Sequence, residues 1–308
     1  MKILVTGGAG FIASHIVDAL VGKNHEVAII DDMSNGQEEN INPQAKFFKV
    51  DISNAEDVNK VFDEFVPEVI FHLAAQANVR RSIENPERDR EVNVVGTLNL
   101  LDNAAKAKTK HFIFSSTGGA IYGEDAPRPT PETEQPKPVS PYGKHKLESE
   151  INIARFAKEN DFKATILRYA NVYGPRQNPR GEAGVIAIFA DKMIANEPMT
   201  MFGTGDQTRD YVFVKDIVSA NLKALESGIE GTFNIGTGKE ISLKQIVESL
   251  ERVCGKKVEV EHLPAIEGEL MASCLDACLA RQILNWQVEY QIEEGLEQTI
   301  NYLQNASN

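Results

Sequence analysis

The chain has 308 residues, of which 42% are hydrophobic and 25% are charged, and its formal net charge is −13 at pH 7. This length and composition indicate a globular protein with one large or two closely packed domains. The acidic balance argues against nucleic acid or an anionic membrane as partner, because such surfaces need clustered Lys and Arg. No apolar run is long enough for a membrane span or a signal peptide, so we expect a cytoplasmic protein. Cys254, Cys274 and Cys278 lack the His/Cys partner pair of a zinc site, so no metal site is expected.

Short apolar runs alternate with helical patterns through the first half of the chain. Six such runs are predicted strands, namely Lys2–Thr6, Glu26–Asp31, Lys46–Asp51, Glu68–Ala74, His111–Ser116 and Lys163–Tyr169. After the first run, Ile12, Ile16 and Leu20 recur at helical spacing and form one apolar stripe. This alternation predicts an α/β fold, a Rossmann-type doubly wound parallel sheet over residues 1–170.

The composition changes after Tyr169, where Gly and Pro become frequent and the predicted strands and helices become shorter. Short strands are predicted at Met199–Gly203, Tyr211–Val214 and Thr232–Gly236. We expect residues 171–308 to form a smaller α+β substrate-binding domain that is partly interleaved with the first.

The first strand is followed by the turn Gly7-x-x-Gly10-x-x-Ala13, which opens a helix. Glycines let a pyrophosphate approach the backbone, and the helix N-terminus offers unpaired N–H groups. Asp31 ends the second strand about twenty residues on, where a carboxylate accepts hydrogen bonds from a ribose diol. Asp32 adds a second acid, and no arginine lies between Ile30 and Asn40, so the pattern favours NAD over NADP. A strand–helix turn that binds no ligand is the alternative. It is the weaker one, because the strand, the glycine turn, the helix and the following acid are all present.

Two further strands end in polar or small residues, Asp51 after the third and Leu73–Gln76 after the fourth. Ligands of open parallel sheets lie over these carboxyl ends. Asp51 either caps the following helix or accepts from an adenine amino group, and the sequence leaves both open.

Tyr142 and Lys146 are four residues apart after Ser140-Pro141, a pattern typical of a helix N-terminus. Helical spacing places both side chains on one face, where the ammonium would lower the tyrosine pKa from ~10 and make it a general acid/base. Tyr211 and Lys215 have the same spacing but lie in an alternating strand pattern, so we do not expect Tyr211 to be catalytic. Thr117 follows the fifth strand and can place its hydroxyl near the ligand, with Ser116 as the competing candidate.

Seven sequence blocks together resemble the extended short-chain dehydrogenase/reductase family, and within it the NAD-dependent UDP-sugar 4-epimerases of the UDP-glucose/UDP-galactose type. The blocks are TGGAGFIA, HLAAQ, EVNVVGT, SSTGGAIYG, YGKHK, LRYANVYGPRQ and FGTGDQTRDYVFVKD. The resemblance spans nearly the full chain. It implies NAD as cofactor, a UDP-sugar as substrate and a homodimer built on helices at 90–106 and 142–159.

The resemblance also implies the site residues. The catalytic residues would be Thr117, Tyr142 and Lys146. The NAD-binding residues would be Gly7, Gly10, Phe11, Ile12, Asp31, Asp32, Ser34, Asn35, Gly36, Asp51, Ile52, Leu73, Ala74, Ala75, Gln76, Asn93, Ser115, Tyr142, Lys146 and Tyr169. The substrate-binding residues would be Thr117, Tyr142, Asn171, Val185, Phe202, Arg209 and Glu269.

The implied reaction is epimerisation at C4 of the sugar. Tyr142 would take the proton of the 4-hydroxyl while a hydride leaves C4 for NAD, and the 4-keto sugar would turn over before the hydride returns. Related dehydratases resemble S-T-D-E-V-Y-G and use the acids for elimination, whereas Gly118 and Gly119 stand here. Other NAD-dependent nucleotide-sugar enzymes (a UDP-N-acetylglucosamine 4-epimerase, a dehydratase or a decarboxylase) are the alternative. A non-catalytic NAD sensor is a remote one.

The chain departs from the family pattern at Ile266, where the family has a phosphate-binding arginine. Arg176 and Arg180 are the candidates to replace it. Ala170 stands where some relatives have an aromatic residue.

Overall fold

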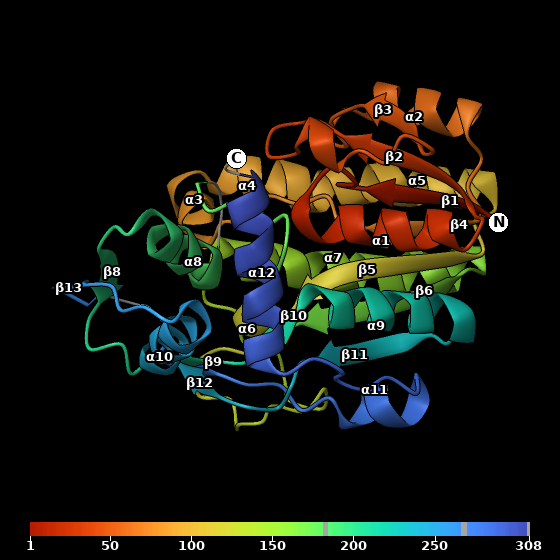
Figure 1. Cartoon of the computed structure of the whole chain (residues 1–308). Coiled ribbons are helices and arrows are strands. Elements are labelled where there is room, and N and C mark those ends of the chain that lie inside the picture. Colours follow the sequence, from red (N-terminus) through yellow and green to blue (C-terminus); the bar gives the residue numbers. More distant parts are fainter. Residues whose placement is uncertain (181–183, 266–269, 307–308) are drawn as a thin grey trace.

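The computed structural model, which describes residues 1–180, 184–265 and 270–306, is built around a seven-stranded parallel sheet (Figure 1). The strand order is β11-β6-β5-β4-β1-β2-β3, and every neighbouring pair is parallel. The strands span β1 (Lys2–Thr6), β2 (Glu26–Asp31), β3 (Lys46–Lys49), β4 (Val69–His72), β5 (His111–Thr117), β6 (Lys163–Tyr169) and β11 (Gly231–Ile235). The predicted doubly wound sheet is confirmed.

Helices cover both faces of this sheet (Figure 1). One face carries α1 (Phe11–Gly22) and α9 (Val214–Ser227), and the other carries α2 (Ala55–Glu64), α5 (Gly96–Ala107) and α7 (Pro141–Asn160). Successive residues of a strand point to opposite faces, so each strand contributes to two cores. Ile3 and Val5 join the core beneath α1, whereas Leu4 joins the core beneath α5.

Outside the large sheet and its covering helices, the described residues form three small sheets, further helices and a third core. The strands are β7 (Asn171–Tyr173), β8 (Met199–Phe202), β9 (Thr208–Arg209), β10 (Tyr211–Phe213), β12 (Ile241–Ser242), β13 (Val260–Leu263) and β14 (Ala272–Ser273). The helices are η1 (Glu38–Asn40), α3 (Val79–Glu84), α4 (Pro86–Arg90), the π-helix η2 (Glu91–Val95), α6 (Gly118–Ile121), α8 (Val185–Ala195), α10 (Leu243–Cys254), α11 (Cys278–Ile283) and α12 (Ile292–Ala306). Side chains of α8, α10 and α12 form the third core.

Two strands of the sheet end two residues earlier than expected, whereas the other predicted strand ends agree to within one residue. β3 ends at Lys49 rather than Asp51, because the Asp51 carboxylate accepts the Ser53 N–H and starts a turn. β4 ends at His72 rather than Ala74, because the Ala74 N–H donates to the Thr6 hydroxyl instead of continuing the ladder. Both differences place polar backbone at the carboxyl edge of the sheet.

The sheet also takes a strand from the second half of the chain. β11 pairs with β6 in parallel, with Phe233 opposite Leu167. The division near residue 170 and the interleaving of the two domains stay predictions.

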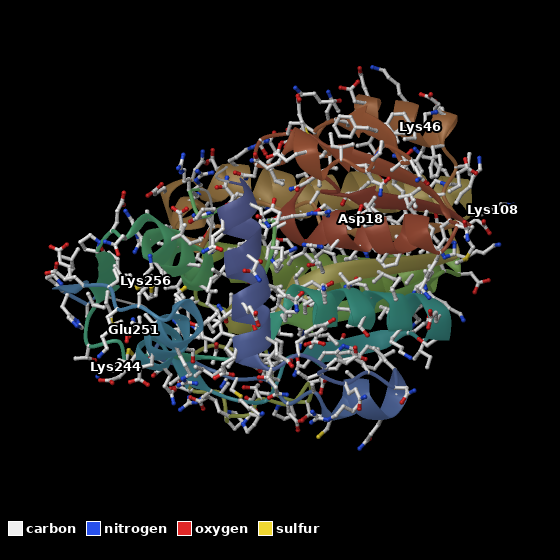
Figure 2. The ribbon with its side chains drawn as sticks, viewed as in Figure 1. Asp18, Lys46, Lys108, Lys244, Glu251 and Lys256 are labelled. Carbon is white, nitrogen blue, oxygen red and sulfur yellow. The ribbon has the colours of Figure 1, made fainter. Side chains whose placement is uncertain are left out.

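Charged side chains cover the outer surface, as Lys46, Lys108 and Lys244 show by pointing outward in Figure 2. Among the described residues, no helix combines the length and apolar character that crossing a bilayer requires. Nor do the described ranges contain three or more His, Cys, Asp or Glu residues grouped to hold a metal ion.

Candidate active site

The glycine turn between β1 and α1 presses against the end of β4. Gly7 has φ +73°, and a Cβ there would lie 2.8 Å from the Ala74 nitrogen. Only glycine fits both this backbone conformation and this close approach. Gly10 precedes α1 and supplies no side chain to cap it, so the helix begins with unpaired N–H groups facing the turn. The turn therefore has the form of a phosphate-binding helix N-terminus.

Asp31 is buried at the end of β2 and holds the glycine turn. Its two oxygens accept the Ala9 N–H at 3.0 Å and the Met33 N–H at 2.9 Å. Burial raises the pKa of Asp31 above its ordinary value, while the two backbone donors act in the opposite direction. Each carboxylate oxygen has a second lone pair, so the group can still accept hydrogen bonds from two hydroxyls of a ligand.

A cavity of about 490 Å³ opens over the carboxyl ends of β1, β2, β3 and β4. Its lining includes most of the residues predicted to bind NAD: Gly7, Gly10, Asp31, Asp32, Ser34, Asn35, Gly36, Asp51, Ile52, Leu73, Ala74, Ala75 and Gln76. A cavity at this edge is the expected place for a dinucleotide in a doubly wound fold.

The other predicted NAD-binding residues do not belong to the lining of this cavity. Phe11 and Ile12 start α1, where their side chains pack in the cores and their N–H groups belong to the helix N-terminus. Asn93 in η2 is buried and holds the loop after β4, since it accepts the Gln76 N–H at 3.1 Å and donates to the Gln76 oxygen at 2.9 Å. Tyr169, at the end of β6, is buried and accepts a hydrogen bond from Asn221 at 2.7 Å.

Several cavity-lining residues were not predicted from the sequence. They are Ile30, Val50, Arg81, Glu84, Asn85, Arg88, Asp89 and Val92. Half of them, namely Arg81, Glu84, Arg88 and Asp89, come from α3 and α4, which border the cavity. The available signal was the dense polar segment at 81–91, whose side chains recur at helical spacing.

Asp51 is held in place by one of these residues, Arg88. Its carboxylate pairs with Arg88 at 2.8 Å and accepts the Ser53 hydroxyl at 2.7 Å. Partial burial works to raise the pKa of Asp51, but the hydrogen bonds from Arg88 and Ser53 outweigh it and the pKa lies below its ordinary value. Asp51 is thus held as a carboxylate beside the cavity.

Tyr142 lies in the first turn of α7, as the sequence pattern predicts. Ser140 caps this helix by accepting the Gly143 N–H at 3.2 Å, and Pro141 occupies its first turn. A Cβ on Gly143 would lie 2.4 Å from the Ala120 oxygen, so glycine lets α7 pack directly on α6. Because α6 follows Thr117, this contact brings the start of α7 to the end of β5.

Lys146 is buried one turn after Tyr142 and points at β5. Its Nζ donates to the Ser115 oxygen at 2.8 Å and lies 4.5 Å from the centre of the Phe114 ring. Burial lowers the pKa of Lys146 to about 8, whereas the charges of Glu150 and Asp89 act to raise it. Residues four apart on a helix share a face, so the lysine lies on the same side of α7 as Tyr142.

The two candidate hydroxyls of β5 have different surroundings. Ser116 is buried and donates to Glu150 at 2.5 Å, and that carboxylate is also held by Arg168. Thr117 is half-buried at the last position of β5, and its side chain does not cap α6. The strand register places Thr117 opposite Tyr169. The Ser116 hydroxyl is thus committed to the protein interior.

The predicted substrate-binding residues lie on the second half of the chain. Asn171 is in β7, and its Oδ1 would lie 3.5 Å from a Cβ on Gly119, so it faces the start of α6 directly after β5. Val185 begins α8, and Phe202 ends β8 with the Arg80 guanidinium 5.9 Å from its ring centre. Arg209 is in β9, where it donates to the Thr208 oxygen. Glu269 and Ile266 lie outside the described residues.

Of the residues proposed to replace the family arginine, Arg176 is paired with Asp18 of α1 at 2.7 Å. Tyr211 lies in β10 with 5% of its surface exposed and packs in the third core. Lys215 lies in α9 and not in the strand, so the two residues of this second Tyr-x-x-x-Lys spacing belong to different elements, and the expected strand holds for Tyr211 only.

The sequence matches the family model described as "NAD dependent epimerase/dehydratase family" over residues 3–236. The chain belongs to this family. It is 44% identical over 303 residues to a putative UDP-glucose 4-epimerase of Methanocaldococcus jannaschii, a match covering 98% of each chain.

Two solved structures of family members resemble this one along the whole chain. One is a UDP-glucose 4-epimerase of Thermotoga maritima with UDP-glucose, at 46% identity and a TM-score of 0.98, covering 100% of both chains. The other is a UDP-glucose 4-epimerase of Thermus thermophilus in complex with NAD, at 40% identity and a TM-score of 0.94, covering 99% of this chain and 100% of that one. The fold of this family member is thus the one that these epimerases have.

Proposed function

We propose that this chain is a UDP-glucose 4-epimerase, which interconverts UDP-glucose and UDP-galactose with bound NAD. The observation that carries the proposal is the meeting of Tyr142 and Lys146 on α7 with the end of β5, next to the dinucleotide cavity. Relatives that are 40–46% identical to this chain bear this name, which supports the same substrate here.

The residues around the cavity fit NAD. Gly7 and Gly10 line the cavity without side chains that would fill it, and Asp31 keeps acceptor capacity for a ribose diol. Gly10 and the start of α1 would hold the pyrophosphate, and Asp31 would hold the adenosine ribose. When bound, NAD supplies the hydride chemistry at C4 of the sugar.

The chain itself supplies proton transfer and orientation. The Lys146 ammonium favours the phenolate form of Tyr142, which takes the proton from the 4-hydroxyl and returns it after the sugar has turned. Thr117 donates a hydrogen bond to the same oxygen and orients it. Asn171 and Arg209 would hold the diphosphate, for which a guanidinium is well suited.

The absence of a carboxylate directly after Thr117 favours epimerisation over elimination. Gly118 and Gly119 occupy these positions, and a Cβ on Gly118 would lie 2.3 Å from Leu275. No acid can therefore be placed at Gly118 without moving Leu275. A dehydratase or decarboxylase needs an acid or base that this end of β5 does not provide.

The test is conversion of UDP-galactose by purified protein, with products separated by chromatography. We expect UDP-glucose to form without net build-up of NADH absorbance at 340 nm, and Tyr142→Phe to lower kcat at least 10²-fold. Tyr211→Phe is the matched control, because it alters the other tyrosine with the same spacing to a lysine. Accumulating NADH, or a Tyr142→Phe variant with near-normal turnover, would contradict the proposal.

We also propose that the enzyme works as a homodimer in the cytoplasm. The dimer is supported by Ile151 on α7, which is 62% exposed in the single chain although it lies on a long sheet-packing helix. Light scattering at micromolar concentration should give twice the chain mass, and a monomer mass would contradict this part. The cytoplasmic location stays a prediction.

A further inference from the structure

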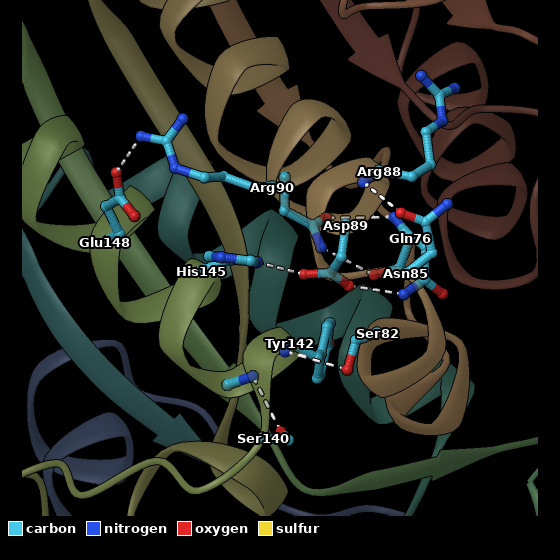
Figure 3. Close-up of polar contacts among 12 residues, drawn as sticks. Gln76, Ser82, Asn85, Arg88, Asp89, Arg90, Ser140, Tyr142, His145 and Glu148 are labelled. Atoms are coloured by element: carbon cyan, nitrogen blue, oxygen red, sulfur yellow. Dashed lines mark hydrogen bonds and ion pairs between the residues drawn. The ribbon is translucent and has the colours of Figure 1, made fainter.

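A buried carboxylate lies between the cavity and the helix that carries Tyr142. Asp89 of α4 has none of its surface exposed, and both of its oxygens are used. One accepts from His145 Nδ1 at 2.5 Å and the other from Gln76 Nε2 at 2.6 Å (Figure 3). A buried carboxylate is costly unless it is hydrogen-bonded, so both contacts are needed to keep Asp89 where it is.

The Asp89 contacts join three separate parts of the site. Gln76 belongs to the loop after β4, lines the cavity and is tied to Asn93 by two hydrogen bonds. Asp89 also lines the cavity, whereas His145 is on α7. A single side chain therefore connects the cavity wall to the helix of the acid–base residues.

His145 holds a particular position on α7, three residues after Tyr142 and directly before Lys146. A carboxylate only accepts hydrogen bonds, so His145 Nδ1 must carry its hydrogen, in the neutral or the charged ring. The Tyr142 N–H makes a second tether, to the Ser82 hydroxyl of α3 at 3.2 Å. In Figure 3 both tethers run from the first turns of α7 to the α3–α4 segment.

Asp89 also acts on Lys146 through its charge. Burial depresses the pKa of Lys146, and Asp89 is, after Glu150, one of the two carboxylates that oppose this effect. On α7 itself, the ionisable neighbours of the Lys146 ammonium are Glu150, His145 and Tyr142. From other elements, Asp89 of α4 and His72 of β4 act on it by their charge or position. Arg81 of α3 lines the adjacent cavity.

We propose that Asp89 and His145 are a positioning pair for the acid–base residues. The pair fixes the first turns of α7 against the cavity, and the charge of Asp89 helps to keep Lys146 an ammonium so that Tyr142 can be a phenolate. This inference rests on the proposed function, because it assigns a role in the same proton transfer.

The experiment compares four variants with the wild type by kcat, KM and pH profile for UDP-galactose. Asp89→Asn removes the charge, His145→Ala removes the donor, and His145→Asn places an amide N–H where Nδ1 was. Glu148→Gln is the matched control, because the exposed Arg90–Glu148 pair joins the same two helices at 2.9 Å. Exposed pairs of this kind contribute little.

Asp89→Asn should lower kcat about 10-fold and change KM by less than about 3-fold. In the pH profile of kcat, the loss of activity at high pH (the alkaline limb) should begin about one pH unit lower, because Lys146 then loses its proton more easily. His145→Ala should lower kcat without moving that limb downward, since the charge of Asp89 remains. His145→Asn should have a kcat within about 3-fold of the wild-type value. Glu148→Gln should have the same kcat as the wild type.

A second readout does not depend on turnover. Amide hydrogen exchange over residues 141–147 should be faster in His145→Ala and unchanged in His145→Asn and Glu148→Gln. The inference is overturned if Asp89→Asn keeps the wild-type kcat and alkaline limb, or if Glu148→Gln changes exchange as much as His145→Ala does. Should Asp89→Asn not fold, the His145 series decides. A wild type that does not epimerise UDP-galactose would refute the proposed function instead, and the exchange data would still test the pair.

Discussion

The two neighbouring hydroxyls of β5 should separate into a structural and a catalytic one. Removing the Ser116 hydroxyl with Ser116→Ala breaks its bond to Glu150, but Arg168 still binds that carboxylate with Nε at 3.0 Å and Nη2 at 2.6 Å. The carboxylate stays satisfied, so we expect a loss of about 1–2 kcal/mol in the free energy of unfolding. With an unfolding entropy of about 2 cal/mol/K per residue, this lowers the Tm by about 2 °C.

Thr117→Val should lower kcat and leave the free energy of unfolding nearly unchanged. It keeps the shape of the half-buried side chain and removes only the hydroxyl, so stability should change by less than about 1 kcal/mol. Loss of a hydrogen bond to the oxygen that exchanges its proton should lower kcat about 10²-fold.

The assay for both variants is formation of UDP-glucose from UDP-galactose, coupled to its oxidation, with thermal unfolding followed in parallel. Ser116→Ala should keep kcat within about 3-fold, because its hydroxyl faces Glu150 and not the cavity. A Ser116→Ala variant that loses 10²-fold in kcat while Thr117→Val turns over normally would refute this assignment.

Two further predictions concern stability. Burial lowers the pKa of His111 to about 4 from 6.5, so its neutral form stabilises the fold above pH 6.5, and this contribution of about 3 kcal/mol is lost as the pH falls from 6.5 to 4. His111→Gln keeps a donor for the Thr165 hydroxyl, which itself donates to a backbone oxygen, and urea unfolding should show a shallower acid loss than the wild type; equal slopes would contradict this. Gly7→Ala should cost at least about 2 kcal/mol and weaken NAD binding in a fluorescence titration, because of its positive φ and the contact with Ala74. Gly22→Ala, with nothing within 4 Å of its Cβ, should be neutral or stabilising, and an equal loss in both variants would show that the turn is not special.

Local features of the chain were readable without the structure. The strand–Gly7–helix unit, Asp31 and the capped start of α7 depend on residues close together in sequence, because turns, caps and helical faces are set by neighbours. For the same reason the strand at Tyr211 could be assigned, whereas the start of α9 before Lys215 was not foreseen.

Features that depend on residues far apart in the chain needed the tertiary structure. β11 joins the central sheet although it follows β6 by some sixty residues, and Arg88 reaches Asp51 across 37 positions. The contact of Asp89 with His145 spans 56 positions. Such pairings are chosen by packing and by the need to satisfy buried charges, which no local pattern encodes.

The end of β5 combines features that the local sequence sets with one that only the tertiary structure sets. The sequence by itself placed a Ser–Thr pair at the end of a strand and a Tyr–Lys pair on a helix. Which hydroxyl remains available was decided by the fold, because Glu150 of α7 and Arg168 of β6 meet beneath the sheet edge and take the Ser116 hydroxyl. A strand presents successive side chains to opposite faces, so Ser116 makes a buried structural contact, whereas the half-buried Thr117, one position further along β5, points to the other face.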